Sequence, residues 1–290
     1  MSLPGWPGEW FLDTLKSVRR NRIPALWVGL VLALGLAGGA LVWFYPRARP
    51  EGGLLSDEVL PVPPAPPRLG GGADYDKCLD MIETDPEGAL EFARTLPGDA
   101  GLHCQALAQV ELGSPDLGAP ILMQVGMDTA EDPAARAAIL GQASQAFLMI
   151  DETVQARAAS EGAVALLPDD PDVRFDDAIA AIQVKDLEGA IADLAVTLAA
   201  DPKRGEALVA RATAYREEGR LDLAAADADA AVALDGVDQD ALLERGIIRQ
   251  RRGDLAGARA DWARVQDIDP DSGSADLATQ NLELLDASGV

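Results

Sequence analysis

A period of 34 residues organises the C-terminal half of this 290-residue chain. Pro168, Pro202 and Pro270 stand one or two periods apart, and Gly236 fills the position between the last two. Three further columns keep the same step: Ala156, Ala190, Ala224 and Ala258; Gly219 and Gly253, continued towards the N-terminus by Lys185 and Asp151; and Asp193, Asp227 and Asp261. A fixed period of this size predicts a repeat protein, in which each unit buries its apolar face against its neighbours.

The composition favours helices and excludes one class of partner. The chain is 48% hydrophobic but only 4% aromatic, and most of its apolar residues are Ala and Leu, which are good helix formers. Its formal net charge is −24, and the excess of acidic residues lies after residue 72. Because phosphate groups are bound by Lys and Arg, we expect no nucleic-acid partner.

The N-terminal region has the features of a membrane anchor. Residues 23–45 carry no charge, are long enough to cross about 30 Å of hydrocarbon, and have Trp27 and Trp43 near their ends. More basic residues precede this stretch than follow it, which predicts that residues 1–22 are a cytoplasmic leader. A cleaved signal peptide is the alternative. The apolar stretch is longer than in such peptides and ends in bulky side chains, so we favour an uncleaved transmembrane helix.

A spacer rich in proline and glycine follows the predicted membrane helix. Residues 46–73 contain seven prolines and, near their C-terminal end, three consecutive glycines at 70–72. Such a segment is expected to be extended and to form no core. The helical domain is therefore predicted at 74–290.

Helix boundaries in this domain are marked by local signals. Three aspartate–proline pairs predict an N-cap followed by proline at the first helical position: Asp85–Pro86, Asp132–Pro133 and Asp170–Pro171. Residues Leu102 to Gly113 predict a helix, and Pro115 and Pro120 are expected to delay the next helix to about Ala119. One or two short helices are expected between Tyr75 and Leu96.

The repeat resembles a known family. One unit carries Leu208, Ala212, Tyr215 and Ala224, and the next carries Leu242, Gly246, Ala258 and Trp262. This pattern resembles the tetratricopeptide (TPR) repeat, a helix–turn–helix of 34 residues. The resemblance implies an all-α, TPR-type solenoid of helical hairpins. Its predicted parts are clear repeats at 137–170, 171–204, 205–238 and 239–272, divergent repeats at 75–135, and a capping helix at 274–286.

Two arginines depart from the usual family pattern. Arg211 and Arg245 stand where the family has a leucine, and we expect them to pair with Asp227 and Asp261 of their own units. Arg245, Arg249 and Arg252 also share one helix face, which predicts either a docking site for an acidic partner or, as we favour, neutralisation of neighbouring carboxylates.

The resemblance also implies a protein-binding groove lined by the first helix of each hairpin. The residues at the inward positions are Phe175, Ile179, Gln183, Val209, Thr213, Arg216, Leu243, Ile247 and Gln250. Apolar side chains flanked by polar ones would suit an extended or helical segment of a partner protein. The alternative is that these residues pack between repeats or beneath an N-terminal segment.

Cys78 and Cys104 are the only cysteines. With the predicted topology they would face an oxidising compartment and lie on neighbouring helices, so we expect a disulfide. A pair of small buried thiols is the alternative.

No motif for catalysis, metal or cofactor binding is recognisable, and the single histidine, His103, is expected to be a surface or capping residue. We therefore expect no enzyme, no cofactor and no small-molecule substrate. Arg greatly outnumbers Lys, which suggests a bacterial source with GC-rich DNA. The sequence predicts a single-pass protein of a bacterial inner membrane, with a periplasmic TPR domain that scaffolds or assembles other proteins of a membrane or periplasmic complex. The alternatives are a structural accessory subunit and, less favoured, an enzyme with its site within 75–135.

Overall fold

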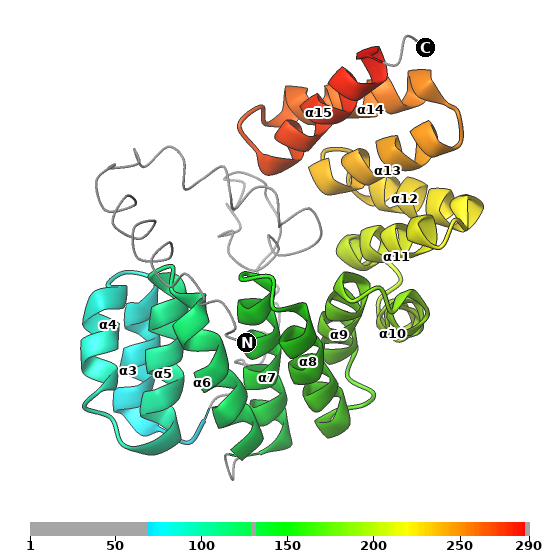
Figure 1. Cartoon of the computed structure of the whole chain (residues 1–290). Coiled ribbons are helices and arrows are strands. Elements are labelled where there is room, and N and C mark those ends of the chain that lie inside the picture. Colours follow the sequence, from blue (N-terminus) through cyan, green and yellow to red (C-terminus); the bar gives the residue numbers. More distant parts are fainter. Residues whose placement is uncertain (1–68, 129–131, 288–290) are drawn as a thin grey trace, which may run out of the picture. The chain divides into compact units, whose positions relative to one another are not determined.

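The computed structural model describes residues 69–128 and 132–287, so the predicted leader, membrane helix and most of the spacer lie outside the described residues. Every regular element in these two ranges is an α-helix (Figure 1). The thirteen helices of the described part are α3 (Gly72–Ile82), α4 (Pro86–Ala93), α5 (Gly98–Glu111), α6 (Pro115–Asp128), α7 (Pro133–Leu148), α8 (Thr153–Leu166), α9 (Pro171–Gln183), α10 (Leu187–Ala200), α11 (Gly205–Glu217), α12 (Leu221–Leu234), α13 (Gln239–Arg251), α14 (Leu255–Ile268) and α15 (Gly273–Ala287). None of the helices described here is both long enough and apolar enough to cross a membrane.

The helices pair in chain order into six hairpins, from α3–α4 to α13–α14, and α15 follows the last one. Neighbouring hairpins also pack on each other, since α7 contacts α9, α9 contacts α11, and α11 contacts α13. This is the architecture of an all-α TPR-like solenoid. The side of α15 that carries Ala275, Ala278 and Leu285 packs into the core of the last hairpin, around Trp262. Helix α15 therefore covers an apolar face that the final repeat would otherwise expose.

The turn within four of the six hairpins explains one column of the 34-residue pattern. Asp151, Lys185, Gly219 and Gly253 have φ values of 60°, 65°, 78° and 84°. This left-handed conformation is unstrained only for glycine. The column therefore records a backbone requirement of the turn, which two of the hairpins meet with a residue other than glycine.

A second column records how closely the two helices of a hairpin approach. A Cβ atom on Gly246 of α13 would lie 2.3 Å from Nε1 of Trp262 on α14, so only glycine fits there. Trp262 is fully buried and donates its indole N–H to the Leu243 carbonyl oxygen at 3.3 Å. One repeat earlier, the equivalent residues are Ala212 and Ala228, both fully buried. The two hairpins therefore fill the equivalent space between their helices with different residues, Gly246 and Trp262 in one and Ala212 and Ala228 in the other.

Several local predictions need correction. Pro115 and Pro120 do not delay α6, because Pro115 begins the helix and Pro120 lies inside it. Proline at the first helical position gives up only an N–H that has no helical partner. Asp132 precedes α7, but its side chain makes no capping hydrogen bond, whereas the Asp85 and Asp170 side chains do.

The folded region also begins slightly before the predicted start of the domain. Leu69, at the end of the predicted spacer, is 5% exposed and packs in the core that contains Tyr75.

Candidate protein-binding face

The nine residues predicted to line a groove lie on three successive first helices of the hairpins. Helix α9 carries Phe175, Ile179 and Gln183, α11 carries Val209, Thr213 and Arg216, and α13 carries Leu243, Ile247 and Gln250. Phe175 and Leu243 are 6% and 9% exposed and belong to the hydrophobic cores between hairpins. The other seven are half-buried. We call the face formed by these nine residues the first-helix face.

Arg216 is used to join two hairpins. Its Nε donates to Oε1 of Glu244 on α13 at 2.5 Å, and the two side chains are only 12% and 8% exposed. Burial raises the pKa of the Glu244 carboxyl, and the Arg216 charge opposes that rise. Removing either partner of a buried ion pair leaves an uncompensated charge. The Arg216–Glu244 pair therefore stabilises the packing of α11 against α13.

Phe175 is covered by an arginine from outside the predicted set. The Arg204 guanidinium lies 4.1 Å from the centroid of the Phe175 ring. It is held there by Oδ1 of Asp172 at 2.6 Å and Oε1 of Glu206 at 2.7 Å. Half-buried Ile179, Val209 and Ile247 therefore form the apolar part of the first-helix face that is reachable by a partner.

Polar side chains that sequence reasoning missed connect the first helices of successive hairpins. His103 of α5 contacts Gln142 of α7, and the Asp176 carboxyl of α9 lies beside Gly141 of α7. Burial raises the pKa of the Asp176 carboxyl to about 7, although the Arg204 charge and the Gln145 hydrogen bond lower it. The 34-residue period alone does not predict these contacts, because each of them joins residues of two different units at positions that are not equivalent.

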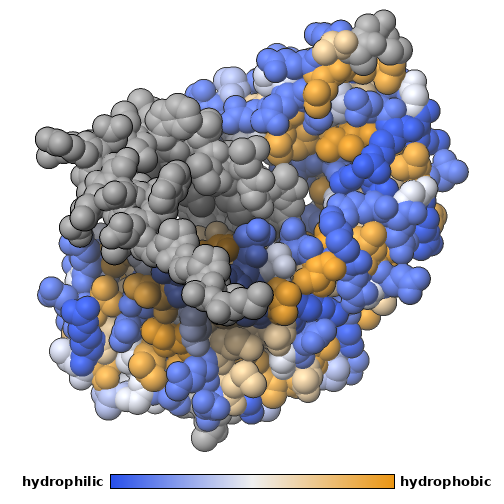
Figure 2. All heavy atoms as spheres, viewed as in Figure 1, coloured by the Kyte–Doolittle hydropathy of each residue, from blue (hydrophilic) through white to orange (hydrophobic). Residues whose placement is uncertain are grey.

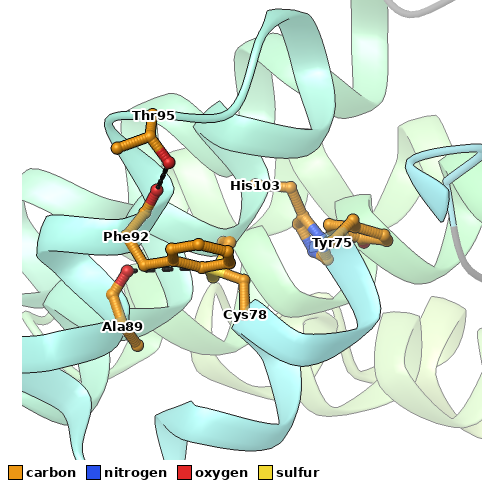
Figure 3. Close-up of a disulfide and its surroundings, with 7 residues drawn as sticks. Tyr75, Cys78, Ala89, Phe92, Thr95 and His103 are labelled. Carbon is orange, nitrogen blue, oxygen red and sulfur yellow. Dashed lines mark hydrogen bonds between the residues drawn. A yellow bond between two sulfur atoms is a disulfide. The ribbon is translucent and has the colours of Figure 1, made fainter. Parts of the chain in front are cut away.

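His103 is not the surface or capping residue that the sequence predicted. It is 5% exposed and lies within α5, beside Tyr75 of α3 (Figure 3). The Tyr75 hydroxyl donates to Nδ1 at 2.6 Å, and Nε2–H donates to Oε1 of Gln142 at 2.7 Å, an arrangement that fits the neutral ring. Burial lowers the pKa of His103, in agreement with a neutral imidazole at pH 7.

Cys78 and Cys104 form a disulfide between α3 and α5 in the structure. Both cysteines are fully buried, and the half-buried side chains packed around them include Phe92 of α4 (Figure 3). The bond closes a loop across the first hairpin of the described residues.

The expected arginine–aspartate pairs are confirmed. Arg211 binds Asp227 through two hydrogen bonds of 2.7 and 2.9 Å, and Arg245 binds Asp261 at 3.0 and 2.7 Å. Arg249 also reaches Asp261, at 2.7 Å. The arginines of α13 therefore neutralise neighbouring carboxylates, the interpretation that the sequence favoured.

On the side shown in Figure 2, apolar residues form small groups among hydrophilic ones. A hollow of about 420 Å³ lies on α14 and α15. Its lining residues are Leu255, Ala256, Arg259, Ala260, Ala263 and Leu285.

The fold, but not the family, is shown by comparison with known proteins. No protein-family model and no curated protein matches the chain. It is similar to the solved structure of MamA residues 41–end from Desulfovibrio magneticus RS-1, with a TM-score of 0.50, 17% identity, and coverage of 70% of this chain and 99% of that one. It is also similar to TTC0263, a thermophilic TPR protein of Thermus thermophilus, with a TM-score of 0.52, 18% identity, and coverage of 65% and 99%. A chain of the Cut9–Hcn1 hetero-tetramer matches with a TM-score of 0.52, 14% identity, and coverage of 71% and 45%.

Proposed function

We propose that this protein is a membrane-anchored scaffold that binds other proteins through the first-helix face, on the extracytoplasmic side of a bacterial inner membrane. The observation that carries the binding role is the row of half-buried Ile179, Val209 and Ile247 on three adjacent helices of a TPR-like solenoid. An apolar row of this kind, flanked by polar side chains, suits a segment of a partner protein.

Two observations support the proposed location. The uncharged stretch at 23–45, with more basic residues before it than after it, favours export of the solenoid. The Cys78–Cys104 disulfide is of the kind that persists in oxidising compartments such as the periplasm.

The binding proposal is tested with substitutions at half-buried positions of the first-helix face. Because Phe175 and Leu243 are buried, replacing them with a charged residue would unfold the solenoid and would not report on binding. Ile179→Asp with Ile247→Asp places two charges on the half-buried row. A matched control, Ala195→Asp with Ala226→Asp, places the same charges on exposed positions of α10 and α12.

The assay is crosslinking and mass spectrometry on gently solubilised membranes that contain the full chain. We expect partners to be lost from the first variant and kept by the control, with equal helix content by circular dichroism. An unchanged set of partners in the first variant would rule out this face.

Topology is tested separately with an alkaline phosphatase fusion after Pro67. We expect an active fusion, because that enzyme needs export to fold. An inactive fusion would contradict the proposed location and leave the binding proposal standing.

A further inference from the structure

The outer side of α6 is apolar, in a chain whose surface is otherwise rich in charge. Leu117 and Met127 are 54% and 57% exposed, and among the described helices only α6 carries two large apolar side chains that are more than half exposed. No charged residue lies between Asp116 and Asp128, at the two ends of this helix. We call the exposed and half-buried residues between these aspartates the α6 face: Leu117, Pro120, Ile121, Met123, Gln124 and Met127.

The helix that carries this face is packed closely against its neighbours. A Cβ atom on Gly118 would lie 2.6 Å from a backbone carbonyl oxygen of α5, and one on Gly126 would lie 2.7 Å from a side chain of α7. Arg136 of α7 donates to the carbonyl oxygens of Gly126 and Met127 at 3.1 and 2.9 Å, which gives partners to the C-terminal end of α6. A partner would therefore meet a preorganised surface, and binding would cost little conformational entropy.

The charge of the chain favours a second copy as the occupant of this face. The formal net charge is −24, so two copies repel each other over most of their surfaces. The α6 face is a place where they can approach without burying a carboxylate, which is costly. A lipid surface is disfavoured, because helices that lie on membranes carry Lys and Arg on their polar side, and α6 has neither. A basic partner is disfavoured too, since the face offers it no anionic group.

The α6 face is also complementary to itself. A two-fold contact uses the same patch on both copies. If two α6 helices pack antiparallel with Leu122 at the centre, residues equally far from Leu122 face each other. Leu117 then faces Met127 of the second copy, and Ile121 faces Met123 of the second copy. Large apolar side chains therefore meet near both ends of the contact.

We propose that this protein forms a two-fold dimer through antiparallel packing of its α6 faces. The 14 residues of α6 give a contact about 21 Å long, so the dimer is weak and reversible. Asp116 would lie opposite Asp128 of the second copy at the rim, and dimerisation should therefore strengthen as salt screens this repulsion. This inference does not depend on the proposed function.

The register is tested by cysteine crosslinking of the full chain in detergent. The native cysteines are joined in a buried disulfide and do not interfere. A mixture of Leu117→Cys chains with Met127→Cys chains should form intermolecular disulfides. Either variant alone should form at least about fivefold fewer, because its two cysteines would lie about 15 Å apart along the helix pair. Equal yields in the mixed and unmixed samples would overturn the antiparallel register.

The contact is tested by sedimentation equilibrium of the full chain. Leu117→Glu with Met127→Glu places like charges opposite each other and should raise the Kd of dimerisation at least about tenfold. The matched control, Leu223→Glu with Leu234→Glu, makes the same change on α12, where the leucines are 42% and 44% exposed, and should dimerise like the wild type. Leu117→Lys with Met127→Glu places opposite charges across the contact and should restore dimerisation.

Three outcomes would overturn the proposal. The first is a wild-type chain that is monomeric at about 0.5 mM. The second is a dimer that persists unchanged in the folded Leu117→Glu, Met127→Glu variant, since the contact would then lie elsewhere. The third is a monomeric wild type that binds phosphatidylcholine vesicles through its α6 face and loses this binding in the same variant, since a lipid surface would then be the occupant.

Discussion

Replacing Gly246 with alanine tests how the helices of the last hairpin fit together. The added Cβ would lie 2.3 Å from Nε1 and 2.7 Å from Cδ1 of Trp262, so the indole or the helix must move. Overpacking of this kind costs about 1–3 kcal/mol, and the better helix propensity of alanine offsets about 1 kcal/mol. Loss of the Trp262 hydrogen bond to the Leu243 carbonyl adds about 1–3 kcal/mol for a buried N–H without a partner. We expect a net loss of about 1–5 kcal/mol.

Replacing Trp262, whose ring limits the space at Gly246, gives a more stringent test. Trp262→Ala alone should lower stability by about 3–5 kcal/mol, because a fully buried tryptophan leaves a cavity. In the double variant the new alanines match the Ala212 and Ala228 arrangement of the preceding hairpin. Gly246→Ala should then be neutral or stabilising by up to about 1 kcal/mol.

Stability is measured by hydrogen exchange of the α13–α14 amides, because a repeat array need not unfold in one step. Ala212→Gly is the reverse change in the preceding hairpin, where we expect a loss of about 1–2 kcal/mol from the poorer helix propensity and the lost buried methyl group. If the effects of Gly246→Ala and Trp262→Ala simply add in the double variant, the Trp262 ring is not what excludes a side chain at position 246.

Three further changes probe other features. Asp151→Gly should stabilise the α7–α8 hairpin by about 0.5–1 kcal/mol, because the turn holds Asp151 at φ 60°, and a loss of stability in urea unfolding would contradict this. Cys78→Ser with Cys104→Ser should destabilise α3–α5 by about 3 kcal/mol from the loss of a crosslink over 26 residues, while exchange in α11–α14 stays unchanged. Asp176→Asn should stabilise α9 at pH 8 by about 1–3 kcal/mol but hardly at pH 4, because the raised pKa means that folding disfavours the ionised carboxyl above about pH 7. An equal effect of Asp176→Asn at both pH values would show that the carboxyl is not buried as described.

Much of the fold could be predicted because the repeat imposes local rules. The 34-residue step indicated the hairpins from α7 to α14, and its column of Asp151, Lys185, Gly219 and Gly253 coincides with the left-handed turns that the structure shows. The pairing of Arg211 with Asp227 was predictable for the same reason, since both residues belong to one unit.

Contacts between units were harder to predict. No sequence pattern indicated that Arg216 would form an ion pair with Glu244, or that His103 would be buried between Tyr75 and Gln142. Side chains at equivalent positions differ from unit to unit, so the period carries no information about which of them meet. Pro120 was misjudged because proline signals a helix boundary only statistically.

The polar contacts between first helices have a consequence for the order of the hairpins. The α5–α7 junction uses His103 with Gln142, and the α11–α13 junction uses the Arg216–Glu244 ion pair. A hairpin placed beside the wrong neighbour would leave one of these buried groups without its partner, at a cost of about 1–3 kcal/mol. The units share one backbone plan, yet these junctions make them unequal, so their sequence along the solenoid is chemically specified and a shuffled array would be less stable than the natural one.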